Sequence, residues 1–385
     1  MTDRERIAFS DVLRGIAPWF VVASHWVGIF WWGPALVSRI TASPLVDGSA
    51  PWLAGWFSLR YFNFGAFGVG LFFLISGLVI PLSVTKNNPL AFIVARVLRI
   101  LPTYMVGLSV GIFAVYCSAK YWALPFPVDW ASFIANALLI GNFFDIPSLD
   151  YVNWTLAIEV KFYLLALLLA GSFRSGKFWP IFLACVLGLI FNLLANFYFN
   201  SVPAWIQAQA KDVMFFSFMF IGSIFYFMFS GKVSRTKGVL YVACLVCLFC
   251  LTWRASTYAP NFFHITLSYG YALVVFAVLF YFRSHIRCNS FLYFLSKISY
   301  PVYVVHPLCG YVILRLAMAQ GWSYYTALFL ALPMVLIISY LVHLVIERPS
   351  IKLGRLIELR MRRVEWADFF RFVSKLSKGV GSAIK

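Results

Sequence analysis

The sequence predicts an all-α, polytopic membrane protein with about ten transmembrane helices and both termini in the cytoplasm. Hydrophobic residues make up 62% of its 385 residues and charged residues only 11%, whereas soluble domains carry about 25% charged residues. A soluble globular protein is therefore excluded. Disorder is excluded as well, because a chain with 19% aromatic residues has ample apolar surface to bury.

Runs of mostly apolar residues define the expected spans, since a membrane helix needs about 20 of them. The first run is not a signal peptide, because it contains Asp11, Arg14 and His25 and has no small-residue cleavage site. The ten predicted spans lie at about 11–32, 61–83, 100–118, 152–171, 177–199, 211–230, 237–253, 264–282, 291–316 and 323–346.

The distribution of basic residues predicts the orientation of these spans. With the N-terminus inside, the inner segments hold most of the Lys and Arg, as the positive-inside rule requires. The outer segments hold only Arg39, Arg60, Lys120, Lys211, Arg254 and Arg315. The net charge of +18 therefore indicates cytoplasmic loops beside a lipid bilayer, and no nucleic-acid partner is expected.

Two units are expected along the chain: a transmembrane domain over residues 1–349 and a basic amphipathic cytoplasmic tail over 350–385. The outer loops 33–60 and 119–151 are long, and the second contains an apolar stretch, 131–144, that is too short to span. The seven Cys lie mostly in apolar runs, so neither a disulfide framework nor a metal site is expected.

Ionisable residues inside spans are costly and are therefore candidates for function. Arg14 and His25 lie eleven residues apart, which is roughly 16 Å along a helix and about 20° around it, so they share one stripe. Arg14 is suited to hold a phosphate near the cytoplasmic surface, and His25 to act as a general base near the membrane middle. The structural alternatives are a snorkelling anchor for Arg14 and an interhelical hydrogen bond for His25.

Three further charges belong to the same hypothesis. Glu159 is expected in the outer half of the fourth span, where it orients or recharges His25 or receives a sugar hydroxyl; Lys161 points to another face and cannot pair with it. Arg96 and Arg99, three residues apart before Pro102, would complete an anion clamp with Arg14. The alternatives are an interhelical hydrogen bond for Glu159 and topology determinants for the two arginines.

Small residues and prolines predict local architecture. Gly65, Gly68, Gly70, Ser76 and Gly77 in the second span are assigned to close helix packing. Pro301 and Pro307 are expected to break the ninth span twice and to free carbonyls beside a cavity that His306 faces. A purely structural role for His306 remains open.

These motifs together resemble the acyltransferase-3 family of membrane enzymes, which includes bacterial O-antigen, exopolysaccharide, Nod-factor and peptidoglycan O-acetyltransferases. The resemblance covers residues 9–355 and combines six short motifs in the family's order. They are Asp11–Ala17 followed by His25; Gly70–Gly77; Arg96–Pro102; Trp154–Leu156 with Glu159, Phe162 and Tyr163; Ser299 and Tyr300 with Tyr303, His306 and Pro307; and Glu347–Pro349.

The resemblance implies acyl transfer, usually from cytoplasmic acetyl-CoA, to a hydroxyl of an extracytoplasmic glycan or lipid-linked sugar. It implies a bacterial inner (plasma) membrane location, with acyl-CoA as a co-substrate and no tightly bound cofactor. His25 and Glu159 would be catalytic, Arg14, Arg96 and Arg99 would bind the donor, and Asp11, Trp154, Tyr300 and His306 would support them. His25 would act either as a general base or as a transient acyl carrier. The long 33–60 loop leaves the choice of acceptor open.

Two other classes of protein remain as alternatives. A transporter or flippase for an anionic or sugar-bearing solute would use the same intramembrane Arg, His and Glu as a binding site or proton relay. A membrane scaffold in a polysaccharide-assembly complex would tolerate mutation of His25 as long as it stayed folded.

Overall fold

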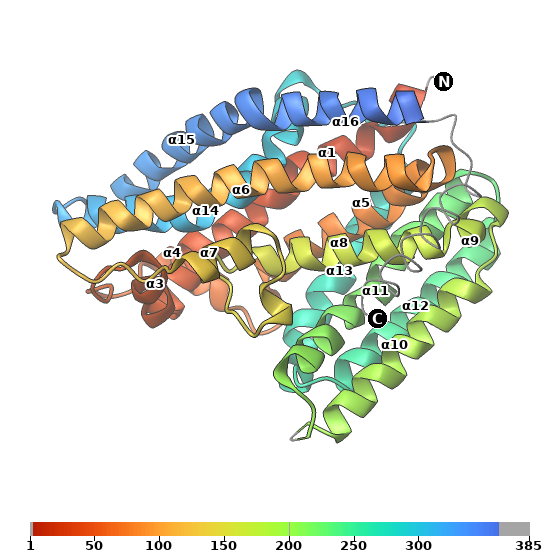
Figure 1. The fold of residues 1–385 in the computed structure, drawn as a ribbon, viewed down its shortest axis with the longest axis horizontal. Coiled ribbons are helices and arrows are strands. Elements are labelled where there is room, and N and C mark those ends of the chain that lie inside the picture. The colour runs from red at the N-terminus through yellow and green to blue at the C-terminus, as the bar shows by residue number, and fades with distance from the viewer. Residues whose placement is uncertain (1–2, 200, 362–385) are drawn as a thin grey trace, which may run out of the picture.

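The computed structural model describes residues 3–199 and 201–361, and over these ranges the chain is a bundle of helices without strands (Figure 1). Nine helices in the described residues are long and apolar enough to cross a membrane, which confirms a polytopic membrane protein. The start of α6 and the short α16 lie at one end of the bundle, called here the α16 end. The small helices α3, α4 and α7 lie at the other, called the loop end.

The first span contains a local change of helix type. It runs as α1 (Asp3–Ala23), continues as a π-helical turn, η1 (Ser24–Ile29), and ends as α2 (Phe30–Trp32). A π-helical turn is wider than an α-helical turn and is found often at functional sites. His25 and Trp26 lie in this turn and are buried.

Helices α5 (Phe64–Lys86) and α11 (Ala204–Phe229) form the centre of the bundle. They can approach closely because glycine faces glycine: a Cβ on Gly77 would lie 1.8 Å from the Met219 carbonyl oxygen, and one on Gly222 would lie 2.2 Å from that of Leu74. Ser223 adds a hydrogen bond of 2.9 Å to the Gly77 carbonyl oxygen. The assignment of the second-span glycines to packing is consistent with these contacts.

Helix α6 (Pro89–Tyr121) corrects the expected start of the third span. The third span was expected to begin at about residue 100, but residues 89–121 form one continuous helix with Pro102 inside it. Asn88 caps the helix through its Oδ1, which accepts a hydrogen bond from Leu90 N at 2.9 Å, and Pro89 occupies the first turn, where no N–H is needed.

Helix α14 (Ser290–Ala319) is also continuous, although two breaks were expected in it. Pro301 and Pro307 both lie within the helix, and the surrounding residues are buried, so neighbouring helices hold the backbone in place. It packs against α1, α6 and α15 (Tyr324–Val342). A second π-helical turn, η5 (His343–Glu347), follows α15 and leads into α16 (Arg348–Met361), which packs on α6.

The fourth expected span is the one that the described structure does not contain as a single long helix. Residues 153–175 form α8 (Asn153–Leu168) and α9 (Ala170–Ser175), and α8 has 16 residues. The expected amphipathic tail begins as α16; residues 362–385 lie outside the described residues. The remaining long helices are α10 (Trp179–Phe197), α12 (Arg235–Arg254) and α13 (Phe262–Tyr281).

The loop end is built from short helical pieces attached to the long helices. Arg315 on α14 holds the first of these loops, because its guanidinium donates hydrogen bonds to the carbonyl oxygens of Pro44 at 2.8 Å and Leu45 at 3.0 Å. Asp129 caps the start of α7, which overlaps the apolar stretch 131–144 that is too short to span. The pieces are α3 (Pro34–Thr41), α4 (Trp52–Gly55), η2 (Trp56–Ser58), α7 (Trp130–Ala137), η3 (Gly141–Phe143) and η4 (Ala259–Asn261).

Candidate active site

Two cavities adjoin in the middle of the bundle. The smaller, about 200 Å³, is lined by all three candidate arginines and is called here the arginine cavity. The larger, about 570 Å³, is bordered by His25 and by many aromatic side chains and is called the aromatic cavity. Val69 and Tyr303 line both cavities, so the two cavities share a wall.

The arginine cavity concentrates positive charge contributed by two helices. Arg14 comes from α1, and Arg96 and Arg99 come from the first half of α6, about one helical turn apart. Arg14 has a neighbouring carboxylate, since its Nη1 lies 3.7 Å from Asp11 Oδ1. Among residues 3–199 and 201–361, no acidic side chain forms a salt bridge with Arg96 or Arg99. The cavity therefore has the charge and shape to bind an anionic group.

Arg96 is held by packing instead of by an ion pair. Its guanidinium carbon lies 5.4 Å from the ring centroid of Phe92 and 5.6 Å from that of Tyr163. Its Nε is buried and has no hydrogen-bond partner in the described part of the chain. A buried donor of this kind is costly unless it is satisfied, so Arg96 is available to an acceptor that enters the cavity.

Glu159 lines the arginine cavity and not the aromatic cavity that His25 borders, although it was expected to assist His25 or to receive a sugar hydroxyl. Its Oε1 accepts hydrogen bonds of 2.7 Å from Ser76 Oγ on α5 and of 2.7 Å from the Tyr163 hydroxyl on its own helix. Both contacts fix the carboxylate beside the three arginines. Ser76, which was assigned only to packing, is therefore also a polar partner of Glu159.

The aromatic cavity is bordered by residues at the loop end of the helices. Trp154 lines it, as do Trp253 and Tyr258, and Asn63 and Asn261 add amide groups at the starts of α5 and α13. Flat aromatic faces combined with a few hydrogen-bonding groups are suited to amphipathic polar ligands. Other lining residues include Asn142, Tyr151, Lys211, Asp212, Tyr269 and Tyr311.

His25 borders the aromatic cavity from the π-helical turn η1. It is 8% exposed, and its Nδ1 is buried without a hydrogen-bond partner in the described residues. The imidazole lies parallel to Tyr311, with ring centroids 6.1 Å apart and an interplanar angle of 2°. Its closest aromatic neighbour is His306, at a centroid distance of 4.9 Å.

His306 lines neither of these two cavities, contrary to expectation. It is 0% exposed and packs between His25 and Tyr303, and its Nδ1 lies 3.0 Å from the Val302 carbonyl oxygen. Its backbone carbonyl accepts a hydrogen bond of 3.0 Å from the Trp26 indole. Gly310 gives room for that indole, because a Cβ there would lie 2.2 Å from Trp26 Nε1.

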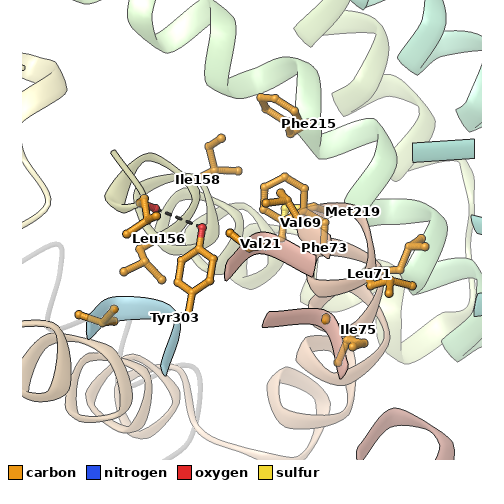
Figure 2. Close-up of a cluster of buried hydrophobic side chains, with 14 of the residues drawn as sticks. Val21, Val69, Leu71, Phe73, Ile75, Leu156, Ile158, Phe215, Met219 and Tyr303 are labelled. Atoms are coloured by element: carbon orange, nitrogen blue, oxygen red, sulfur yellow. Dashed lines mark hydrogen bonds between the residues drawn. The ribbon is translucent and has the colours of Figure 1, made fainter. Parts of the chain in front are cut away.

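The shared wall between the cavities is closed by a hydrogen bond. The Tyr303 hydroxyl lies 2.7 Å from Thr155 Oγ1, which joins α14 to α8. Figure 2 shows the Tyr303 side chain within a cluster of buried hydrophobic residues, next to Leu156 in this view. The two cavities therefore meet at a wall that a hydrogen bond between two helices holds in place.

Lys161 and Asp212 form an ion pair that the sequence analysis missed. Lys161 Nζ on α8 lies 2.5 Å from Asp212 Oδ2 on α11, with side chains 18% and 8% exposed. The expectation that Lys161 does not pair with Glu159 agrees with this contact. An intramembrane lysine needs an acidic partner. Asp212, at the start of the sixth expected span, is an acidic residue from which this pairing could have been predicted.

The remaining predicted residues fall into three places. Asp11 lies beside Arg14, and Trp154 lines the aromatic cavity with its ring centroid 5.5 Å from that of Phe215. Tyr300 lines the arginine cavity and donates a hydrogen bond of 2.9 Å to the Ile100 carbonyl oxygen, tying α14 to α6. His25 is therefore the one predicted catalytic residue in the aromatic cavity.

A helical membrane protein with a cationic cavity and a histidine-bordered cavity on either side of one wall has the layout of an enzyme for two substrates. The chain belongs to the acyltransferase family described as Acyltransferase domain (Acyl_transf_3), whose profile matches residues 7–344. It is therefore an acyltransferase.

The chain is also similar to one curated protein. The chain is 24% identical to Nodulation protein 10 of Rhizobium leguminosarum bv. viciae over 320 residues, which cover 75% of this chain and 83% of that protein. No solved structure matches the chain. The resemblance found in the sequence motifs is confirmed at the level of the family.

Proposed function

We propose that this membrane acyltransferase moves an acyl group, acetyl in the simplest case, from acyl-CoA to a hydroxyl of a carbohydrate. The observation that carries the proposal is the pair of cavities on either side of Tyr303: one holds the arginines and the other is bordered by His25. A donor with phosphates and an acceptor with hydroxyls would each find a matching cavity, and a reactive group between them.

The donor side of the proposal rests on charge. Arg14, Arg96 and Arg99 would bind the phosphates of acyl-CoA, since guanidinium groups make bidentate, charge-assisted hydrogen bonds to phosphate oxygens. Glu159 would balance these charges when no donor is bound, a role on the donor side in place of the one expected beside His25. The thioester end of the donor would extend past Tyr303 toward His25.

The acceptor side rests on the lining of the aromatic cavity. Trp154, Trp253 and Tyr258 supply flat faces for a sugar ring, and Asn63 and Asp212 supply hydrogen-bonding partners for its hydroxyls. The cavity lies at the loop end, which the positive-inside rule assigns to the outer face of the membrane. An extracytoplasmic glycan or a lipid-linked sugar in a bacterial inner (plasma) membrane is the proposed acceptor.

The proposed reaction uses His25 as a general base. Its imidazole would take the proton from the acceptor hydroxyl while the hydroxyl oxygen attacks the thioester carbonyl carbon. A carbon–oxygen bond forms, the carbon–sulfur bond breaks, and the CoA thiolate leaves and takes the proton back from the imidazolium. The variant in which His25 first carries the acyl group would leave a transient acyl-imidazole.

Mass spectrometry of surface glycans tests this function. Strains with the wild-type protein, with no protein and with His25→Ala would be compared for an acyl mass increment. His285→Ala is the matched control, because His285 is exposed and lies outside both cavities. We expect the increment in the wild type and the control only. Unmodified glycans in all strains, with altered glycan export, would support a transporter instead.

A further inference from the structure

His25 and His306 are both buried, and each has one ring nitrogen without a hydrogen-bond partner in the described part of the chain. The buried atoms without a hydrogen-bond partner in the described part of the chain include Nδ1 of His25 and Nε2 of His306. The two rings are 4.9 Å apart between centroids and are tilted by 52°. At this spacing, modest ring rotations bring two imidazole nitrogens to a hydrogen-bonding distance of about 3 Å.

The tautomer of His306 follows from its backbone contact. A carbonyl oxygen only accepts hydrogen bonds, so the Nδ1 that lies 3.0 Å from the Val302 carbonyl oxygen carries the proton. Neutral His306 then has a lone pair on Nε2, which makes that nitrogen an acceptor. The only unpaired group that His306 offers to His25 is therefore an acceptor.

The acceptor on His306 determines which nitrogen of His25 is basic. To bond to it, Nδ1 of His25 must carry the proton, and in a neutral imidazole the lone pair then lies on Nε2. Nε2 of His25 is not among the buried, unpartnered atoms, and the ring borders the aromatic cavity. The resulting arrangement directs the basic nitrogen toward the cavity and away from the protein interior.

We propose that His306 is a positioning residue that accepts a hydrogen bond from Nδ1 of His25 and thereby holds the Nε2 lone pair of His25 ready for the acceptor hydroxyl. This inference rests on the proposed function of His25 and adds a residue that does not touch the substrate. The π-helical turn that carries His25 and the indole of Trp26, bonded to the His306 carbonyl, keep the two rings adjacent.

Two amide variants of His306 distinguish its role as a hydrogen-bond acceptor from a role in packing alone. In His306→Gln the side-chain amide reaches the position of Nε2, so its oxygen can accept from His25. In His306→Asn the amide reaches only the position of Nδ1, so it keeps the contact to Val302 and loses the acceptor. Both variants replace an imidazole with a neutral amide, and both leave the residues of the arginine cavity unchanged.

Kinetics of purified protein in lipid nanodiscs provide the first readout. With acetyl-CoA and the glycan identified by mass spectrometry, we expect kcat of His306→Asn to fall about 10- to 100-fold, the usual effect of losing the partner that orients a functional histidine. His306→Gln should stay within about threefold of the wild type, and KM for acetyl-CoA should be unchanged in both. Equal losses in both variants, or none in either, would overturn the proposal.

Nitrogen NMR provides a second readout that needs no activity. The protein has five His, so ¹⁵N-histidine labelling combined with His25→Ala identifies the His25 signals. We expect the Nδ1–H tautomer of His25 in the wild type and in His306→Gln, and its loss in His306→Asn. An Nε2–H tautomer in the wild type would refute the positioning role even if His25 is essential. Full activity of His25→Ala would instead refute the proposed function.

Discussion

The hydroxyl of Tyr303 lies 2.7 Å from Thr155 Oγ1 at the wall that separates the arginine cavity from the aromatic cavity. The bond joins α14 and α8, the helices that also carry Tyr300 and Glu159. In the proposed function, binding of a donor on one side and of an acceptor on the other is a separate step from the passage of the acyl group between them. Binding and transfer should respond differently to mutations at this wall.

Filling the wall should block transfer without removing the donor. Val69 also lines both cavities, so Val69→Phe adds bulk at the point of passage. We expect acetyl-CoA to bind within about threefold of its wild-type Kd while transfer falls by two orders of magnitude or more, because the thioester no longer reaches His25. Equilibrium binding and product formation would be measured on the same preparation.

The control for this variant is Ile265→Phe, which also places a phenyl ring in the aromatic cavity but away from the shared wall. It should weaken acceptor binding and leave transfer of the bound acceptor largely intact. If Val69→Phe transfers as fast as the wild type, the two cavities do not communicate through this wall.

Removal of a cavity arginine should act on the donor alone. For Arg99→Ala we expect the Kd for acetyl-CoA to rise about 10- to 100-fold, since a hydrogen bond to a charged group contributes about 1.5–3 kcal/mol. The Kd of Arg99→Lys for acetyl-CoA should lie between those of Arg99→Ala and the wild type. The lysine ammonium keeps the positive charge but lacks the planar, two-pronged geometry of the guanidinium. Isothermal titration calorimetry would give both constants.

Lys86→Ala is the matched control for the arginine variants, since Lys86 is an exposed cation at the end of α5 and does not line the arginine cavity. Its Kd for acetyl-CoA should equal that of the wild type. A similar loss in Arg99→Ala and Lys86→Ala would show a general effect of surface charge and no specific phosphate site.

Loss of one partner of the Lys161–Asp212 ion pair should destabilise the fold more than loss of both partners. Asp212→Leu leaves Lys161 without its partner, and breaking a buried pair from one side typically costs about 3–5 kcal/mol. The double variant with Lys161→Met should recover a large part of this loss, since apolar replacements of buried pairs are well tolerated. Thermal unfolding in detergent would compare the two, and equal melting temperatures would contradict the buried pairing.

The contact between α5 and α11 should not accept a methyl group. Gly77→Ala would place a Cβ 1.8 Å from the Met219 carbonyl oxygen, and we expect a loss of at least about 2 kcal/mol in unfolding free energy. The same change at Gly270 on α13 meets no atom within 4 Å and should be neutral or slightly stabilising, because alanine favours the helix. A chemical-denaturation series would distinguish the two sites.

Much of the fold could be predicted because the membrane imposes it. Apolar runs of sufficient length located nine helices that the described structure contains. The point at which one apolar run divides into two helices was harder to predict. Nothing in the composition of residues 152–171 marks the change from α8 to α9 at Leu169. Prolines led to wrong predictions of helix starts and breaks. Pro102, Pro301 and Pro307 all lie within continuous helices, because neighbouring helices support the backbone there.

The candidate site was predictable in its composition and less so in its arrangement. Helical spacing placed Arg96 and Arg99 on one face, and both line one cavity. The position of Glu159 depends on Ser76 and Tyr163, which meet it only in the folded bundle, so its distance from His25 was not available from the sequence. The contact between Tyr104 and Asp150 was also not available from the sequence. The two residues are far apart along the chain, but the Tyr104 hydroxyl donates a hydrogen bond of 3.0 Å to the Asp150 carboxylate.

The π-helical turn η1 has a consequence for how the first span tolerates insertions and deletions. A π-helical turn holds one more residue than an α-helical turn of similar length, so the segments before Ser24 and after Ile29 are out of phase with a regular α-helix. Deletion of a single residue here would let an ordinary helix connect both flanks without moving them. The span would remain inserted in the membrane, and the imidazole would turn away from its neighbours.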